Sequence, residues 1–473
     1  MAELAVQMGK GPEAEQFDLS RLENFPYGTP KSPTMSYLSP LIGKNSLVSI
    51  NGEMWKTLRK RFNSGFAPQH LLKLLPNIIE KVPPFLDHLD RFAETGETAL
   101  LSDYTTNLTF DIIGMATMDM DFAAQKPPAE RGELVTLYIE LVDSFKALED
   151  TPVSPWLLHP MVAMRQVQIA RRIDPMIKTR SVLSLALEGV DNLTDDILQQ
   201  TCDNLKTFLF AGHDTTSILL QWSFYELERS PKVAEALCAE LDELFGPDTD
   251  PEVVMKALAE RGDEIMNKMT YTSAFIKEIL RLYPPGGSAR LVPPGTGLFV
   301  TAPGGKSYCL DGMLIYLCPT VIQRDPEVFG PTCNDFLPER WIGDSDTSMR
   351  TNSGLVVGDG DKASAGGSTA GAGKKTPPSA WRPFERGPRN CIGQELANIE
   401  SKIILACVAR RYEFVKVGVG AIKRDEAGEK VMGDNGKYVA ETELYSSRQI
   451  TAKPVDGLVA KVRLKPGAKS RTS

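Results

Sequence analysis

The spacing of apolar positions predicts a chain built mainly from helices. Residues 52–92 show the pattern of a helix, a loop and a second helix, and residues 105–122 continue an apolar repeat close to 3.6 residues. Similar patterns predict helices at residues 232–246, 270–282 and 394–411. We therefore expect helices to form most of the core.

The longest predicted helix runs from Thr194 to Arg229. Thr194 is a suitable N-cap, Asp195 and Asp196 complement the helix dipole in the first turn, and the residues RSP at 229–231 end the helix. At 1.5 Å per residue, about 35 residues make a rod on the order of 50 Å. A helix of this length can cross a whole domain.

The pattern changes in the last third of the chain. Residues 284–342 are rich in Pro and Gly with short β-like pieces, and a β-rich tail follows the helix at 394–411. Between them, residues 343–379 are rich in Gly, Ser, Thr and Ala and can bury very little, which predicts a flexible surface insertion. The expected fold class is α+β, mainly α with a smaller β-rich lobe.

Composition and charge narrow the class of protein. The chain has 473 residues, 42% of them hydrophobic and 24% charged, as in ordinary globular proteins. Its formal net charge is -8 without a dense Lys/Arg stripe, so we do not expect a nucleic-acid partner. The cysteines and histidines lack the close spacing of a zinc site, a redox dithiol or an HExxH couplet. We expect reduced thiols, an intracellular protein and no transmembrane helix.

One cysteine stands in an unusual loop, PFERGPRNCIGQELA, at residues 383–397. Gly387 and Gly393 permit backbone angles that other residues avoid, so the chain can wrap closely around whatever meets Cys391. The helix that follows would direct its first N–H groups at the sulfur and favour a thiolate, the form that binds metals. The alternative is that Cys391 is a small buried hydrophobic residue.

The loop matches F-x-x-G-x-R-x-C-x-G through Phe384, Gly387, Arg389, Cys391 and Gly393. It resembles the haem-thiolate loop of the cytochrome P450 superfamily. The resemblance implies that Cys391 is the axial ligand of the haem iron, that Phe384 packs over the sulfur side and that Arg389 pairs with a haem propionate. A thiolate ligand pushes electron density to the iron and favours O–O cleavage.

The middle of the long helix, FLFAGHDTTSILL, is weakened by Gly212 and by the β-branched Thr215 and Thr216. Asp and Thr side chains compete for backbone hydrogen bonds and would open a local groove, although a tolerated kink is an alternative. The segment resembles the oxygen-binding motif of the family. The resemblance implies that Thr215 hydrogen-bonds oxygen and that Asp214 relays protons, while His213 only packs.

Two arginine motifs also resemble family motifs. In KEILRLYPP, Glu278 and Arg281 lie three residues apart on one helical face, which alone could be a solvated ion pair. With Arg340 of the later FLPERW, they resemble the E-x-x-R and P-E-R elements, which implies a buried, structural ionic cluster behind the haem.

Near the start, EMWKTLRKRFNSGF places Trp55 and Arg59 one helical turn apart. This spacing is compatible with simple amphipathic packing. It also resembles the W-x-x-x-R helix of the family, which implies that both side chains donate to haem propionates. Arg290, in GGSAR, lies near a further propionate arginine of the family.

The resemblance covers nearly the whole chain and implies the cytochrome P450 fold. We expect a shortened N-terminal segment at residues 1–51, followed by a single domain at residues 52–473 that contains the insertion. The implied cofactor is haem b. The implied location is the cytoplasmic face of the endoplasmic reticulum, with membrane association but without an anchor in this sequence.

The implied function is a haem-thiolate monooxygenase that uses O2 and electrons from an NADPH-dependent diflavin reductase. Its substrate is expected to be an apolar organic molecule, either a secondary metabolite or a fatty-chain compound. One alternative is a reductase-independent isomerase or dehydratase, although the presence of Asp214 and Thr215 argues against it. The other is a haem-binding protein without turnover.

Overall fold

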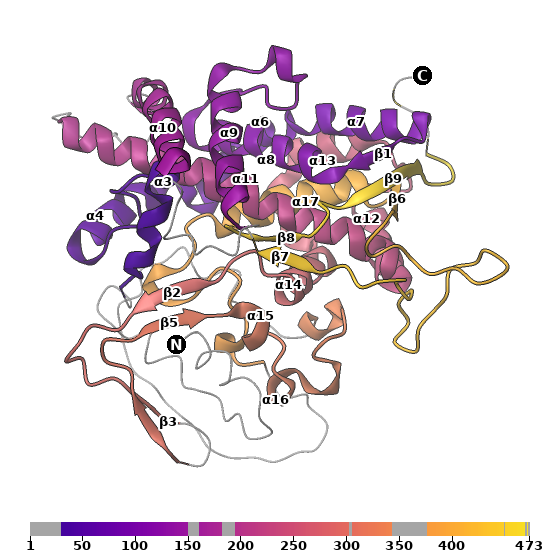
Figure 1. Cartoon of the computed structure of the whole chain (residues 1–473). Helices are drawn as coiled ribbons and strands as arrows, with labels where there is room; N and C mark the ends of the chain where they lie inside the picture. The colour runs from indigo at the N-terminus through magenta and orange to yellow at the C-terminus, as the bar shows by residue number, and fades with distance from the viewer. Residues whose placement is uncertain are drawn as a thin grey trace.

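A computed structural model shows a helix-rich chain with small antiparallel sheets (Figure 1). Residues 1–29 of the expected N-terminal segment and residues 343–375 of the expected insertion lie outside the part of the chain that is described. The described residues are 30–149, 160–181, 194–301, 305–342, 376–448, 450–468 and 471.

The helices cover most of the described chain. The predicted helices are present, whereas α3, α9, α10, α13, α15 and α16 were not predicted. The α-helices are α3 (Ser39–Ile42), α4 (Gly52–Asn63), α5 (Pro68–Lys73), α6 (Leu75–Ile79), α7 (Val82–Thr95), α8 (Leu101–Met118), α9 (Glu133–Glu149), α10 (Pro160–Ser181), α11 (Asp195–Arg229), α12 (Pro231–Phe245), α13 (Pro251–Lys268), α14 (Thr270–Leu282), α15 (Pro319–Ile322), α16 (Pro326–Phe329) and α17 (Gln394–Val408).

The strands pair antiparallel in small sheets. β9 lies between β1 and β6, while β2 pairs with β5, β3 with β4 and β7 with β8. The strands are β1 (Thr98–Leu100), β2 (Ser288–Leu291), β3 (Phe299–Thr301), β4 (Ser307–Cys309), β5 (Leu314–Leu317), β6 (Tyr412–Lys416), β7 (Ser446–Arg448), β8 (Ala452–Pro454) and β9 (Val459–Leu464). The observed α+β class agrees with the predicted one.

α11 organises the core. Its predicted bounds are confirmed: the Thr194 hydroxyl accepts a hydrogen bond from the Ile197 N–H at 3.3 Å, and the helix ends at Arg229 before Pro231. Figure 1 shows α11 among the other long helices, and it packs against α8, α10, α17 and β6. Most of its side chains are buried, so polar residues in its middle must find partners inside the protein.

The predicted ionic cluster at the end of α14 is present. Arg281 donates two hydrogen bonds to the Glu278 carboxylate, at 2.8 and 2.7 Å, and neither side chain is exposed to solvent. Arg340 lies 3.5 Å from the same carboxylate. The alternative of a solvated surface pair is therefore wrong.

Glu278 has further partners that the sequence did not indicate. The Leu337 N–H and the Trp341 indole N–H each donate to its carboxylate at 2.9 Å. Arg281 also donates to the backbone carbonyls of Gln323, Cys333 and Asp335. The cluster therefore joins α14 to the irregular chain around Arg340.

α17 contacts α11 through a buried carboxyl group. Glu400 of α17 is 2% exposed and shares a hydrogen bond with Thr216 of α11. Burial raises the pKa of Glu400 from 4.5 to about 8, and the Thr216 contact opposes this rise. Glu400 is therefore protonated at neutral pH and joins the two helices as a neutral group.

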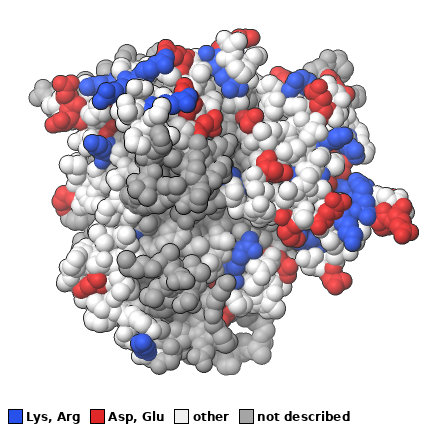
Figure 2. Space-filling view, in the orientation of Figure 1, with Lys and Arg blue, Asp and Glu red and all other residues white. Residues whose placement is uncertain are grey.

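The surface shown in Figure 2 mixes acidic and basic side chains. Among the described residues, none of the helices combines the length and the apolar character needed to cross a membrane.

We predict that Glu278→Gln lowers the free energy of unfolding by about 3 kcal/mol, because it leaves Arg281 and Arg340 without their buried counter-charge. Urea unfolding of the haem-loaded protein measures this loss. Glu264→Gln, which breaks an exposed pair with Lys268, is the matched control and should change little. An equal effect of both substitutions would contradict the prediction.

We also predict a pH-dependent effect of Glu400→Gln. A carboxyl group with a raised pKa contributes its full stability below pH 4.5 and loses it as the pH rises to about 8. The wild type should therefore lose about 1.4 kcal/mol per pH unit relative to the variant across this range. Urea unfolding at pH 5 and pH 8 tests this, with Glu441→Gln at an exposed site as the control. A difference that stays constant with pH would refute it.

Candidate functional site

The cysteine loop is held in shape by its own backbone before α17 begins. The Cys391 N–H donates to the Phe384 carbonyl at 2.8 Å, which closes the loop. Gly387 has a φ of 73°, as its predicted conformational freedom requires, and Glu385 also has a positive φ, of 56°. Gly393 does not need such freedom, because its φ is −88°, and that part of the expectation is wrong.

Gly393 instead leaves room beside the Cys391 sulfur. A Cβ atom at this position would lie 3.9 Å from the Cys391 sulfur and 4.0 Å from the Phe66 ring. These are ordinary van der Waals distances, so a methyl group would fit here. A larger side chain would compete with whatever contacts the sulfur.

The Cys391 side chain is exposed, which rules out the alternative of a small buried hydrophobic residue. Dense surrounding protein nevertheless raises the pKa of the thiol, while the Gly393 and Gln394 N–H groups, Arg59 and Lys31 oppose this rise. The helix start therefore acts on the thiol in the predicted direction, but it does not outweigh the desolvation of the thiol by the surrounding protein. A bound metal cation would supply the missing stabilisation of the thiolate.

Arg59 of α4 lies next to the cysteine. Its guanidinium donates to the Asn390 carbonyl at 2.7 Å and to the Asn390 side-chain oxygen at 3.0 Å. Arg389 lies over the Trp55 ring, 4.3 Å from its centroid, and donates to the Ile50 carbonyl at 3.0 Å. The structure thus joins the predicted residues of α4 to those of the cysteine loop.

Arg290 and Lys31 extend this group of cations. Arg290 pairs with Glu385 at 3.0 Å, and the backbone of Lys31 pairs with that of Arg290. Burial, and next the charge of Arg290, lower the pKa of Lys31 to about 7. Lys31 was missed by the sequence reasoning, because no spacing motif marks it.

Several positively charged side chains lie close together near Cys391. Burial lowers the pKa of Arg389 to about 9, and the nearby Arg290 and Arg59 add to the effect. A bound anion would relieve this repulsion. We refer to Lys31, Arg59, Arg290 and Arg389 as the cation cluster.

These residues fit a haem. Among the described residues, His, Cys, Asp and Glu side chains do not gather in threes at metal-binding distance. A haem would need only one such ligand from this site, and Cys391 could provide it. The cation cluster would favour the two negatively charged propionates.

The oxygen-motif segment of α11 remains a regular helix. The Thr215 hydroxyl donates to the Ala211 carbonyl at 2.7 Å, and both residues are only half-buried. The expected competition of side chains for backbone hydrogen bonds is present at Thr215, whose hydroxyl bonds to a carbonyl one turn earlier. Gly212 serves packing: a Cβ there would come within 2.5 Å of Ile113 of α8.

Asp214 is buried and turned toward β8. Its carboxylate lies 2.5 Å from the Lys453 ammonium and accepts a hydrogen bond from the Thr451 hydroxyl. Burial would favour its protonated form, but the Lys453 ammonium keeps the pKa of Asp214 below 3.8. Thr215 and Asp214 are therefore adjacent in sequence without a hydrogen bond between their described side chains. No sequence motif marks Lys453 or Thr451 as partners of Asp214.

His213 packs inside the helix bundle, as expected. Its Nδ1 lies 2.6 Å from the Leu209 carbonyl, and its ring contacts Phe110 and Tyr138. Burial lowers the pKa of His213, so the ring is neutral at pH 7.

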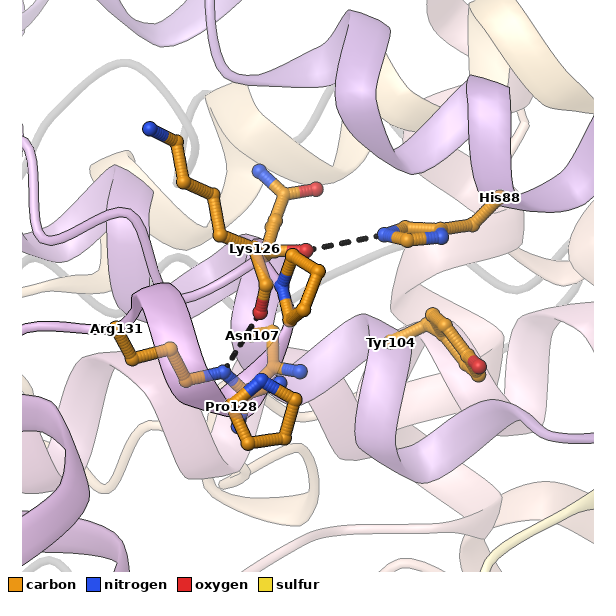
Figure 3. Close-up of a pocket in the computed structure, with 8 residues that line it drawn as sticks. His88, Tyr104, Asn107, Lys126, Pro128 and Arg131 are labelled. Atoms are coloured by element: carbon orange, nitrogen blue, oxygen red, sulfur yellow. Dashed lines mark hydrogen bonds between the residues drawn. The ribbon is translucent and has the colours of Figure 1, made fainter.

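A separate hollow lies between α7, α8 and the loop before α9. It has a volume of about 130 Å³ and is lined by His88 and Tyr104 and by the loop residues Lys126, Pro128 and Arg131; Figure 3 shows the His88 ring directed toward this loop. Among the hydrogen bonds of this loop, His88 Nε2 lies 3.1 Å from the Gln125 carbonyl, and Arg131 donates to the Lys126 carbonyl at 2.8 Å. None of the predicted site residues lines this hollow.

Comparison with known proteins agrees with this site. The family model described as Cytochrome P450 matches residues 4–438. The chain is 33% identical over 452 residues to cytochrome P450 monooxygenase acrF of Aspergillus aculeatus, covering 91% of this chain and 86% of that protein. It is 27% identical over 380 residues to the bifunctional cytochrome P450/NADPH–P450 reductase ascE of Acremonium egyptiacum, covering 76% of this chain and 32% of that protein.

The fold also has a solved counterpart. The crystal structure of the cytochrome P450 CYP102L1 matches with a TM-score of 0.68 at 18% sequence identity, and the match covers 96% of this chain and 91% of that one. The family model and the relative from Aspergillus aculeatus together show that this chain belongs to the cytochrome P450 family of haem b-containing monooxygenases.

Proposed function

We propose that this protein inserts one atom of O2 into an apolar organic substrate, with electrons from NADPH delivered by a reductase. The observation that carries the proposal is the exposed Cys391 thiol beside the cation cluster. That combination provides one sulfur ligand for iron and a place for two propionates. The reductase assignment is supported by the relative from Acremonium egyptiacum, whose name joins a P450 to an NADPH–P450 reductase.

Several residues of the site would hold a haem, each through a different contact. Cys391 would bind the iron, Phe384 would cover the sulfur side, and Gly387 would shape the loop between them. Trp55 lies beneath the Arg389 guanidinium and would donate a hydrogen bond to a propionate beside the cation cluster. When bound, the haem supplies the activation of O2, and its thiolate ligand favours O–O cleavage.

Asp214 and Thr215, in the middle of α11, would supply the protons. The half-buried Thr215 hydroxyl could exchange its bond to the Ala211 carbonyl for one to a ligand, since a hydroxyl rotates about its own side chain. Asp214 is the nearest acidic residue in the sequence and is charged at neutral pH, because its pKa is lowered. We propose that Asp214 passes protons to Thr215 after its carboxylate turns away from β8.

The substrate is proposed to be a secondary metabolite or a fatty-chain compound. We also propose that residues 52–473 act as one domain at the cytoplasmic face of the endoplasmic reticulum. A hydrophobic core that is continuous from Leu38 to Val462 supports the single domain. Substrate-induced difference spectra against lipids and against polyketide or terpene intermediates would identify the substrate class.

The retained Asp214 and Thr215 favour a monooxygenase over the reductase-independent isomerase or dehydratase. They also favour it over a haem-binding protein without turnover. NADPH consumption with a reductase and a substrate panel distinguishes the three functions, because only the monooxygenase couples NADPH oxidation to product formation.

We predict that the reduced wild-type protein with carbon monoxide shows the red-shifted Soret band of thiolate-ligated haem and that Cys391→Ser abolishes it. A serine oxygen cannot replace the electron donation of a thiolate. Monooxygenase activity should fall below detection in the variant. Cys318→Ser, on a half-buried cysteine outside the loop, is the control and should keep the band. A Cys391→Ser protein with an unchanged spectrum would refute the proposed iron ligand.

We also predict that Lys31→Met speeds haem loss about tenfold, equal to about 1.4 kcal/mol of binding free energy, because it removes one cation from the propionate region. The rate of haem transfer to an excess of apomyoglobin measures this. Lys31→Arg should stay close to wild type, and Lys44→Met, at an exposed position of the same segment, should have no effect. Equal rates for Lys31→Met and Lys44→Met would show that Lys31 does not contact the haem.

A further inference from the structure

The β7–β8 hairpin lies against the middle of α11. Figure 1 shows it between the helical core and the β2–β5 sheet, and β8 contacts α11. The strands pair from Ser446 with Pro454 to Arg448 with Ala452. The Ala452 N–H also donates to the Pro285 carbonyl at 2.8 Å, which ties the hairpin to the chain after α14.

Both oxygens of the Asp214 carboxylate are held by this hairpin. Oδ1 forms the ion pair with Lys453 at 2.5 Å, and Oδ2 accepts the hydrogen bond from Thr451. The Asp214 side chain is 2% exposed and that of Lys453 is 23% exposed. This is a largely buried ion pair between two segments that are more than two hundred residues apart in the sequence.

Lys453 provides the main positive charge at Asp214. The other titratable neighbours are His213 of α11, which burial keeps neutral, and Tyr138 of α9. Burial raises the pKa of the Tyr138 phenol well above 10, so it carries no charge at neutral pH. Without Lys453, a charged Asp214 would therefore be buried without a compensating cation.

This arrangement directs Asp214 away from Thr215. Successive residues of an α-helix project about 100° apart, because each turn contains about 3.6 residues. Thr215 donates to the Ala211 carbonyl within α11, while the Asp214 carboxylate points to β8. Asp214 can turn toward Thr215 only by leaving Lys453 and Thr451.

We propose that Lys453 is a positioning residue that, together with Thr451, ties Asp214 to the β7–β8 hairpin and so controls when this carboxylate can serve Thr215. The proposal rests on the proposed monooxygenase function and adds a regulator to its proton supply. The coupling acts in both directions, because a contact that restrains Asp214 restrains the hairpin equally. A substrate that displaces the hairpin would thereby release the acid.

The test uses the haem-loaded full chain as wild type, Lys453→Met, Asp214→Asn and the double variant. Lys453→Arg is the conservative replacement, and Lys461→Met, on the exposed side of β9, is the matched control. Hydrogen exchange reports the protection of backbone amides in the hairpin, residues 446–454. Thermal unfolding between pH 4 and pH 7 reports the ion pair.

The expected exchange result is faster exchange in the hairpin for both Lys453→Met and Asp214→Asn, while Lys453→Arg and Lys461→Met resemble wild type. The double variant should unfold at a higher temperature than Lys453→Met, because it no longer buries an unpaired charge. Unchanged hairpin exchange in both single variants would overturn the proposal. If Lys453→Met does not fold, Thr451→Val and the double variant test the same contact.

The expected pH result follows from the lowered pKa of Asp214. In the wild type, the contribution of this group is present above pH 3.8 and is lost as the pH falls through the lower folded-state pKa. In Lys453→Met, burial raises that pKa, so the variant loses stability as the pH rises. The difference in melting temperature should therefore widen from pH 4 to pH 7. It should not widen when Asp214→Asn is already present, and a purely structural role of Lys453 would give no widening in either background.

These readouts separate the two proposals. Cys391 is present in every variant of this test, so each should keep the thiolate-type carbon monoxide spectrum. Absence of that spectrum from the wild type would reject the proposed function while leaving the exchange and pH results to judge the ion pair. The normal spectrum with unchanged exchange and no pH effect would reject the role of Lys453 alone.

Discussion

The concentration of positive charge around one cysteine is the constraint on which the rest of the site depends. Lys31, Arg59, Arg290 and Arg389 come from different parts of the chain and repel one another in a region that solvent reaches poorly. Such an arrangement is unfavourable in a protein interior unless anions join it. A bound haem would place two carboxylates near the cations and an iron near the sulfur, and so would stabilise both features.

The surrounding structure holds these groups in place with neutral contacts and paired charges. Asn390 receives Arg59, the Trp55 ring supports Arg389, and the Phe384 carbonyl closes the loop at Cys391. Buried hydrogen bonds also hold the segment that precedes the cysteine loop in the sequence. The Glu278 carboxylate accepts them from Arg281, from the Leu337 N–H and from the Trp341 indole. The Glu278 carboxylate is thus paired with Arg281 of its own helix and with Arg340 from a later segment.

α11 combines structural and chemical roles for a related reason. Because most of its surface is buried, its polar residues are bound to neighbours: Thr216 to Glu400, Asp214 to Lys453, and Thr215 to its own backbone. Only Ala211, Gly212 and Thr215 in the central turns remain partly accessible. The contacts of Asp214 with Lys453 and Thr451 couple the position of this carboxylate to that of the β7–β8 hairpin.

The sequence by itself determined the local features of this protein. The bounds of α11, the cysteine-loop motif and the Glu278–Arg281 spacing were all predictable, because capping, apolar period and short motifs depend on residues close together in the chain. Only the tertiary structure decided that Lys31 joins the cation cluster, that Lys453 pairs with Asp214 and that Gly212 fits against Ile113. These contacts join segments far apart in sequence, and no local pattern records which distant charge or side chain will be brought into reach when the helices pack.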